Sequence, residues 1–522
     1  MVTIHNIVNP IRPDVDAENW ARQFKGFSGT VTCFGFSFHH AQAFNHAAPE
    51  AAVVYMDPRL PDTKLINATL PARQKVGRTW GEWKEHWSAL ANRWKPVRST
   101  HLTAFDVAFQ QEHRAFCYQL GREIQAMVSD RCTSIRFGYE WQTNYLSNLR
   151  FLNRCVPVSR MFDRMKGHPV ILVSSGPSLD KNVQLLAEAK GRALVIAVGS
   201  AFTKLHRLGI EPDFAISFDG GVYNSLGHFA GLRSQLPLIF DPILHSKVLE
   251  EYPGRLIVMS IWPGGMLLDR PTGCDVGYVS IGPSVSCTAF ALAYKMGANP
   301  IVFIGQDCAF SEDRTHASGT HVDGTIDADN AYALRAVHGD RQPVEGQNGE
   351  QLISNPSLLT FKHWFEETIR GVDPARIVLN ATEGGANIRG ARNISFREVL
   401  DVHCRRDISV DIDSMTKALF APHTFDISRC IEHLRASRVC AHKLIADIAA
   451  DRCEPLAKEL PNPRYAMIAF SMQAAWEQVQ CGLKDKEIYP LITDAMQFTL
   501  PLLDRTIESL EKQNEHGTIS VH

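Results

Sequence analysis

Six short apolar segments, alternating with stretches of helical periodicity, constrain the fold of this chain more than any other feature. Each segment is continuously apolar rather than alternating, as expected of a strand buried on both faces. Strands of this kind separated by helices are typical of a parallel sheet with helices on both sides. The sequence therefore predicts an α/β fold with a Rossmann-like parallel sheet, whose strands cover residues 170–174, 193–198, 214–217, 238–240, 256–260 and 301–304.

The regions that flank this sheet differ from it in pattern. A chain of 522 residues is too long for one hydrophobic core and predicts two or three domains. Residues 30–34 and 52–56 predict buried strands, whereas the last 120 or so residues show only amphipathic helices (426–452, 463–483, 491–512). We therefore expect a smaller α/β domain at 1–160, a central domain at 161–400 and an all-α domain at 401–522.

Composition excludes several classes of partner. The 54 basic and 56 acidic residues give a net charge of −2 with no long run of either sign. Nucleic-acid binding and polybasic membrane anchoring both need a concentrated basic surface, so neither is expected. No apolar run approaches the ~20 residues that span a bilayer, and no signal peptide is evident. The twelve cysteines are scattered without a C-x-x-C pair, which favours a reducing, cytoplasmic location.

The turn after the first N-terminal strand resembles a nucleotide-fold turn but retains a single glycine, Gly35. A dinucleotide fingerprint needs several glycines, so that the backbone can approach a pyrophosphate. We interpret this turn as structural, with any ligand site degenerate.

The turn after residues 170–173 is the first candidate site. It contains Ser175, Gly176, Pro177 and Ser178, and it opens a helix. Backbone N–H groups and the positive end of a helix suit an anion such as a nucleotide phosphate. A turn with one glycine can equally be structural, and the sequence leaves both readings open.

Two aspartates follow neighbouring strands of the predicted sheet. Asp219 precedes a Gly-Gly pair, and Asp241 precedes a proline. In open α/β sheets ligands bind beyond the carboxyl ends of the strands. Carboxylates there can hold Mg²⁺ or accept hydrogen bonds from sugar hydroxyls, but an aspartate can also simply cap a turn.

The densest polar segment follows the strand at 301–304. It carries Gln306, Asp307, His316, Thr320 and His321. A neutral histidine there can take a proton from an attacking hydroxyl, and a charged one can steady a departing phosphate. The alternative is that these histidines are ordinary surface residues of a loop.

A fourth segment, at 381–390, is rich in glycine and follows a strand at 377–380. Its glycines permit close approach of the backbone, and Glu383 could contact an acceptor hydroxyl. A structural turn is the alternative.

Taken together, these segments resemble the motility-associated (Maf) flagellin glycosyltransferases, whose central domain is related to the 6-hydroxymethylpterin diphosphokinases and similar to bacterial sialyltransferases. The resemblance covers most of the chain up to about residue 392, including residues 35–57 and 141–148. The matching motifs are Ser175-Gly176-Pro177-Ser178-Leu179, Asp219, Ser284-Val285-Ser286, Gly305-Gln306-Asp307, His316-Ala317 and Thr382-Glu383-Gly384-Gly385-Ala386.

This resemblance implies transfer of a nonulosonic, sialic-acid-like sugar from a CMP donor to Ser or Thr hydroxyls of a flagellin-like protein. It implies His316 and Asp307 as catalytic residues, with His321 as the alternative histidine. It implies Thr320 and Glu383 as acceptor or loop residues. The residues that it implies for the donor are Ser175, Gly176, Pro177, Ser178, Asp219, Ser284, Ser286 and Gln306. One departure is that Gly199-Ser200 stand where the sialyltransferases place an asparagine for the nucleotide.

Two other functions remain open at this point. One is pyrophosphoryl transfer from ATP to 6-hydroxymethyl-dihydropterin, with Mg²⁺ held by Asp219 and Asp307; Asp241 is a further possible ligand. The other is a non-catalytic partner of the export machinery. No cofactor is firmly implied, and fold resemblance alone does not decide between these functions.

Overall fold

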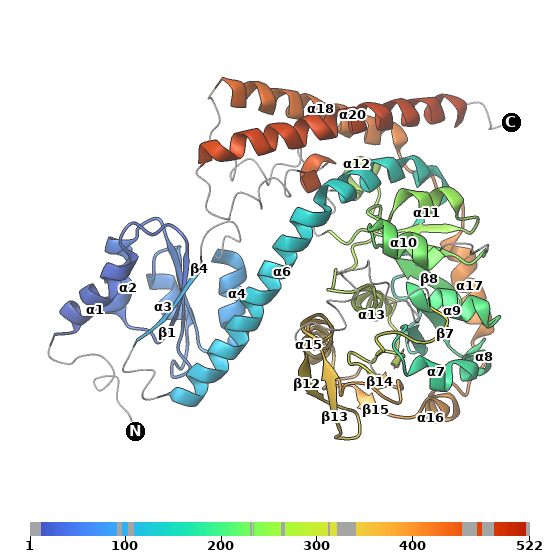
Figure 1. Cartoon of the computed structure of the whole chain (residues 1–522), viewed down its shortest axis with the longest axis horizontal. Coiled ribbons are helices and arrows are strands. Elements are labelled where there is room, and N and C mark those ends of the chain that lie inside the picture. The colour runs from blue at the N-terminus through green and yellow to red at the C-terminus, as the bar shows by residue number, and fades with distance from the viewer. Residues whose placement is uncertain are drawn as a thin grey trace. The chain divides into compact units, whose positions relative to one another are not determined.

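The computed structural model describes residues 12–90, 97–102, 109–229, 232, 234–262, 267–311, 314–320, 341–450, 467–471 and 485–517. Contacts divide the chain into two compact units, Met1–Arg136 with Ala475–Ile488, and Phe137–Ala474 with Tyr489–His522. The predicted α/β class, with parallel sheets and a helical C-terminal region, is confirmed (Figure 1). The bounds of the three domains expected from the sequence stay predictions.

The first unit is built on a four-stranded parallel sheet in the order β3-β2-β1-β4. Its strands are β1 (Thr30–Phe34), β2 (Ala52–Met56), β3 (Gln74–Gly77) and β4 (Val97–His101). The described α-helices before Gln110 are α1 (Pro13–Ala21), α2 (Phe38–Ala47), α3 (Lys64–Thr69) and α4 (Trp80–Leu90). The two predicted strands form with the expected bounds, and all their residues except the partly buried Ala52 are buried.

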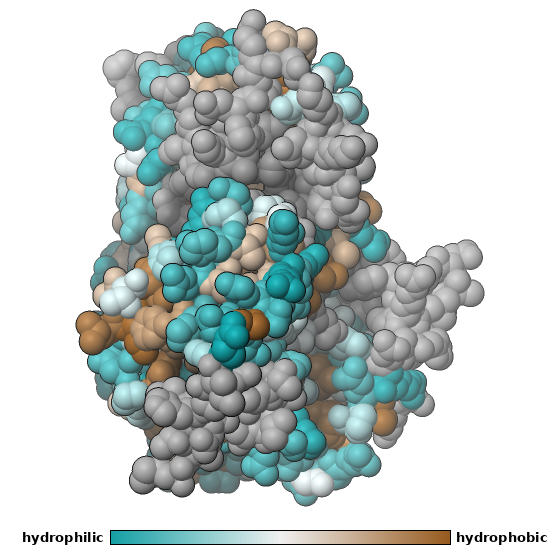
Figure 2. All heavy atoms as spheres, turned by 90° about the vertical axis from the view of Figure 1, so that its left-hand side faces the viewer, coloured by the Kyte–Doolittle hydropathy of each residue, from teal (hydrophilic) through white to brown (hydrophobic). Residues whose placement is uncertain are grey.

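Aromatic packing fills the core of this unit. Trp83 is fully buried between Trp80 and Trp87, and Phe34 and Tyr55 are also fully buried. At the surface, Figure 2 shows hydrophobic side chains interspersed with hydrophilic ones. The single glycine of the first turn, Gly35, has a φ of 101°, a conformation that favours glycine. A structural need therefore accounts for this glycine.

The second unit contains a nine-stranded parallel sheet in the order β15-β14-β11-β6-β7-β8-β9-β10-β5. All six predicted central strands are present, together with the strand predicted just before residue 381. The strands are β5 (Cys155–Pro157), β6 (Val170–Val173), β7 (Leu194–Val198), β8 (Phe214–Ser217), β9 (Leu238–Phe240), β10 (Leu256–Val258), β11 (Ile301–Ile304), β14 (Val378–Asn380) and β15 (Arg392–Asn393).

The order of this sheet reverses at one point. Strands β6 to β10 are added successively toward one edge, and β11 then pairs with the other side of β6. Loops that follow β6 and β11 therefore diverge at the carboxyl edge of the sheet. This is the position at which open α/β sheets bind their ligands.

Helices cover both faces of the sheet. Right-handed connections place the helices between β6 and β10 on one face and those on either side of β11 on the other (Figure 1). The first set comprises α7 (Leu179–Asn182), α8 (Leu186–Ala189), α9 (Ser200–Arg207), α10 (Val222–Phe229) and α11 (Ser246–Glu251). The second comprises α13 (Val285–Lys295) and α15 (Pro356–Gly371). The small residues of α13 are buried against the sheet, and Gly297, with a φ of 86°, follows its end as predicted.

The C-terminal part of the second unit is helical. Its long helices are α17 (Ser409–Leu419), α18 (Ile427–Ala449) and, from Tyr489 onward, α20 (Asp485–Gly517). Most of the helix predicted at 463–483 lies outside the described residues. An ion pair between Arg438 and Asp504 (2.9 Å) joins α18 to α20. Among the described helices, none is both long and apolar enough to cross a membrane.

Candidate functional site

The turn after β6 is held by the segment that follows β11. The N–H of Gly176 donates to the carbonyl of Gly305 (2.8 Å). The N–H and hydroxyl of Ser178 donate to Oδ2 of Asp307 at 3.1 and 2.6 Å. These two amides are thus bound to protein acceptors, and the predicted contact of this turn with a donor phosphate stays a prediction.

Gly176 is required by packing inside the protein. A Cβ at this position would lie 2.1 Å from Oδ1 of Asp307 and 2.6 Å from the carbonyl oxygen of Gly305. Its φ is not positive, whereas Gly305 (67°), Cys308 (51°), Glu383 (58°) and Gly385 (75°) have positive values. Gly176 therefore leaves room for the Asp307 carboxylate and the Gly305 carbonyl.

Asp307 is the central acceptor of this arrangement. Its side chain is buried, and burial raises its pKa to about 6, against the opposing effect of the two bonds from Ser178. Its backbone packs against Gly385, where a Cβ would lie 2.4 Å from the Asp307 Cα. Asp307 therefore organises the turn after β6 and the glycine-rich turn after β14, and its catalytic role stays a prediction.

The segment 314–320, which carries His316, is fixed beside the same turn. The N–H of Ala317 donates to the carbonyl of Ser175 (2.8 Å). His316 itself is half-buried, with Nδ1 2.9 Å from the hydroxyl of Thr315. Thr320 is buried and donates to the carbonyl of Ala317 (3.0 Å), so its hydroxyl stabilises this segment. The alternative histidine, His321, lies outside the described residues.

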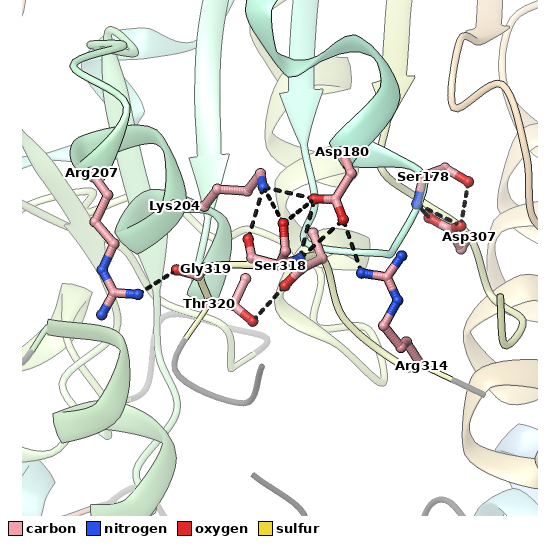
Figure 3. Close-up of polar contacts among 10 residues, drawn as sticks. Ser178, Asp180, Lys204, Arg207, Asp307, Arg314, Ser318, Gly319 and Thr320 are labelled. Atoms are coloured by element: carbon pink, nitrogen blue, oxygen red, sulfur yellow. Dashed lines mark hydrogen bonds and ion pairs between the residues drawn. The ribbon is translucent and has the colours of Figure 1, made fainter. Parts of the chain in front are cut away.

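Contacts from α7 and α9 hold this segment from its other side (Figure 3). The carboxylate of Asp180 accepts from the Ser318 N–H, the Ser318 hydroxyl and Arg314. Lys204 donates to Asp180 (2.7 Å) and to the Ser318 carbonyl (2.8 Å). Burial, the largest single effect, raises the pKa of Asp180, but the bonds from Lys204, Ser318 and Arg314 together keep it below its ordinary value. The segment is therefore anchored by a partly buried ion pair.

Serine hydroxyls line the carboxyl edge near this segment. The hydroxyl of Ser175 lies 2.5 Å from the hydroxyl of Ser200, which begins α9 after β7. Ser174 donates to Gln306 (2.8 Å), so the amide of Gln306 is buried in the join between β6 and β11. Pro177 lies in the turn between Gly176 and Ser178 and supplies no N–H.

The predicted serines Ser284 and Ser286 lie at the start of α13. Ser284 caps this helix by accepting from the N–H of Cys287, and its hydroxyl is 2.8 Å from that of Ser286. Because α13 precedes β11 and runs antiparallel to it, its positive N-terminus lies at the carboxyl edge. The first amides of a helix have no partner within it, and they suit an anion.

The two predicted aspartates differ in their surroundings. Asp219 follows β8 at the same edge of the sheet as Gly176 and Asp307, as expected, and accepts from the Gly221 N–H (2.9 Å). Asp241 is fully buried, with its two oxygens bound to the N–H groups of Ile243 and Ile261 at 3.0 Å each. Its geometry supports a structural role. Across the described residues, no group of three or more His, Cys, Asp or Glu side chains could hold a metal ion.

Burial gives Asp241 a predictable effect on stability. Burial raises its pKa to about 7, with the two N–H bonds opposing the shift, whereas an unfolded aspartate has a pKa of about 3.9. Between these values the folded protein binds a proton that the unfolded chain lacks, so this group's contribution to stability falls as pH rises.

Asp241→Asn cannot ionise, so the variant should gain stability relative to the wild type by up to about 1.4 kcal/mol per pH unit in this window. Denaturant unfolding of both proteins at pH 5 and pH 7 measures the change. A difference in unfolding free energy that does not vary with pH would contradict it.

Glu383 joins the turn after β14 to the start of α16 (Phe396–Glu398) and to Lys181. It has a φ of 58°, and its carboxylate accepts from the N–H of Phe396 (2.8 Å). Its carbonyl accepts from Lys181 (2.9 Å). The residue is exposed at the surface, so a further contact with an acceptor remains a prediction.

Two asparagines that sequence reasoning missed shape the edge of the sheet. Both lie at the end of α6 (Gln110–Asn148). Asn144 donates to the carbonyls of Gly220 and Ile243, and Asn148 donates to those of Pro242 and Leu244. They therefore fix the loops after β8 and β9. Their spacing of four residues, which places them on one helix face, was the available signal. Asp180 and Lys204 were also missed, and no local pattern marks them.

The fold and this site define a recognised class of domain. Residues 143–313 match the model of the 6-hydroxymethylpterin diphosphokinase MptE-like family. The matched region contains β6 to β11, the turn at Gly176 and Asp307. The second unit is thus similar to this family over the matched residues.

A solved structure extends the likeness over nearly the whole chain. The MAf glycosyltransferase from Magnetospirillum magneticum AMB-1 superposes with a TM-score of 0.52 at 13% identity, covering 99% of this chain and 87% of that one. This chain therefore has the fold of that glycosyltransferase, and the resemblance predicted from the motifs is confirmed for the fold. An uncharacterized protein of Treponema pallidum (strain Nichols) is 22% identical over 129 residues, which span 25% of this chain and 60% of that relative.

Proposed function

We propose that this protein is a glycosyltransferase that moves a nonulosonic sugar from a CMP donor to Ser or Thr hydroxyls of a flagellin-like protein. The observation that carries the proposal is that the segment with His316 is bound to Ser175 at the switch point of the sheet. A candidate acid–base group is thereby held at the place where such sheets bind ligands. The shared fold with a glycosyltransferase supports the same activity.

In this mechanism the donor lies along the carboxyl edge between β6 and α13. The N-terminus of α13 and the hydroxyls of Ser175, Ser284 and Ser286 would support the CMP phosphate. His316 would take the proton from the acceptor hydroxyl as its oxygen bonds to the anomeric carbon and the bond to phosphate breaks. The same imidazole could instead donate a proton to the departing phosphate. Most of the catalytic effect would come from electrostatic support of that phosphate.

Asp219 would contact the nucleotide or the acceptor, and Asp307 would hold the turn at Gly176 in place. The proposed mechanism routes no step through a metal. We place the reaction in the cytoplasm, which also fits the ten cysteines that the structure describes as free thiols.

Pyrophosphoryl transfer from ATP to a pterin alcohol is the second candidate, because the matching family model bears that name. It would need carboxylates open to Mg²⁺. The Asp307 carboxylate is buried and bound to Ser178, while β6 and β7 separate its strand from that of Asp219. The residues outside 143–313 also favour a larger acceptor than a pterin.

A thermal-shift screen of the full chain against CMP, CDP, ATP and GTP separates these functions. A nucleotide that binds only the folded state stabilises it by RT ln(1 + [L]/Kd), which is about 2.7 kcal/mol at 100 times Kd. We expect the cytidine nucleotides to raise the melting temperature and the purine nucleotides to leave it nearly unchanged. A rise with ATP and Mg²⁺ but not with CMP would favour the pterin reaction. No rise with any of the four would favour a non-catalytic partner of the export machinery.

A further inference from the structure

The first turn of α7 holds the chain after β11 at two separate points. Ser178 binds Asp307, and Asp180, two residues further on, binds Ser318. These contacts join residues 129 and 138 positions apart in the sequence. The part of the loop that carries His316 therefore lies between two anchors on one short helix.

The second anchor is an ion pair with little exposure. The side chains of Lys204 and Asp180 are 8% and 25% exposed, and their nearest atoms are 2.7 Å apart. Lys204 also donates to the Ser318 carbonyl, and Arg207, one turn further along α9, donates to the Gly319 carbonyl (2.8 Å). Charge-assisted bonds of this kind are stronger than neutral ones and hold geometry more tightly.

These contacts join α7 and α9 to the segment. Among the described residues, the Asp180 carboxylate is bound by Ser318 and Arg314 of the segment and by Lys204, which itself binds the segment (Figure 3). No bond from this carboxylate to the sheet is among them. Burying a lysine is costly unless it is paired. The buried charge of Lys204 thus contributes to fixing this one loop.

We propose that Asp180, together with Lys204, is a positioning residue that clamps segment 314–320 and so holds His316 beside the Ser175 turn. The catalytic half of this inference rests on the proposed function, whereas the clamp itself does not. Asp180 acts through Ser318 and Ala317 and does not touch the reacting groups.

The test uses the full chain with Asp180→Asn. The variant keeps a similar shape but loses the charge that pairs with Lys204. Hydrogen exchange followed by mass spectrometry should show faster exchange of the Ala317 and Ser318 amides. Transfer should slow by about 10²-fold, the order expected when a reacting group is misplaced by about 1 Å. The fall should appear in kcat, with the donor KM near the wild-type value.

A second variant and a matched control complete the design. Ser318→Ala removes the hydrogen bond from the Ser318 hydroxyl to Asp180 (3.0 Å) and leaves the ion pair with Lys204 intact. It should therefore speed amide exchange and lower kcat less than Asp180→Asn does. Glu188→Gln is the control, because Glu188 of α8 pairs with Arg397 at 2.7 Å through both its oxygens, with both side chains well exposed. It should leave exchange and transfer unchanged.

The outcomes separate the clamp from the proposed function. Unchanged exchange in Asp180→Asn would overturn the clamp. Faster exchange with unchanged kcat, in a protein that His316→Ala impairs, would overturn the positioning role. A variant that combines Asp180→Asn with His316→Ala should transfer no more slowly than His316→Ala alone, because both substitutions act through the His316 imidazole. If His316→Ala transfers sugar at the wild-type rate while Asp180→Asn shows faster amide exchange, the catalytic role of His316 is overturned and the clamp is supported.

Discussion

Replacing His316 with alanine should lower the rate of sugar transfer by about 10²–10⁴-fold, the usual contribution of a positioned acid or base. The imidazole lies one residue from the bond between Ala317 and Ser175, so the backbone of the segment should keep its place when the ring is removed. Proton transfer acts in the transition state. The loss should therefore appear in kcat more than in the donor KM.

Steady-state kinetics with a CMP-activated nonulosonate and a flagellin acceptor would measure this loss. His321→Ala is the natural control, five positions further along the chain. If His321→Ala causes the larger loss and His316→Ala behaves like the wild type, the catalytic role moves to His321. If neither substitution matters, the pterin reaction or the non-catalytic reading gains support.

Gly176→Val should abolish nucleotide binding and destabilise the second unit. A Cβ at this position meets the Asp307 carboxylate at 2.1 Å and the Gly305 carbonyl at 2.6 Å, and the Gly176 N–H is bonded to that same carbonyl. The turn and the strand end must therefore separate. Overpacking of this kind costs about 1–3 kcal/mol.

Gly176→Ala should show most of the same effect, because the clash begins at Cβ. Gly371→Ala is the matched control: a Cβ there meets nothing within 4 Å, and its φ is not positive. Melting temperatures with and without CMP would report stability and binding together. Gly176→Ala could instead match Gly371→Ala in melting temperature and show the same rise in melting temperature on adding CMP. That result would show that Asp307 can move aside at little cost in stability.

The sequence alone determined the central sheet because buried parallel strands must be apolar along their length. Residues 170–174 and 301–304 carry that pattern, and the strands form at Val170–Val173 and Ile301–Ile304. Strands β3 and β4 escaped notice because they are polar edge strands, which become strands only by pairing with β2 and β1. The short β5 and β15 depend on their neighbours in the same way.

The candidate site divides along similar lines. That Gly176, Asp219 and Asp307 share one edge follows from each coming after a parallel strand, and the sequence could predict it. That Asp307 binds Ser178, or that Asp180 binds Ser318, could not be predicted, because these partners are more than a hundred residues apart. A local pattern records which face of an element is buried. Only the folded sheet brings distant polar groups together and decides which carboxylate holds a loop and which faces a ligand.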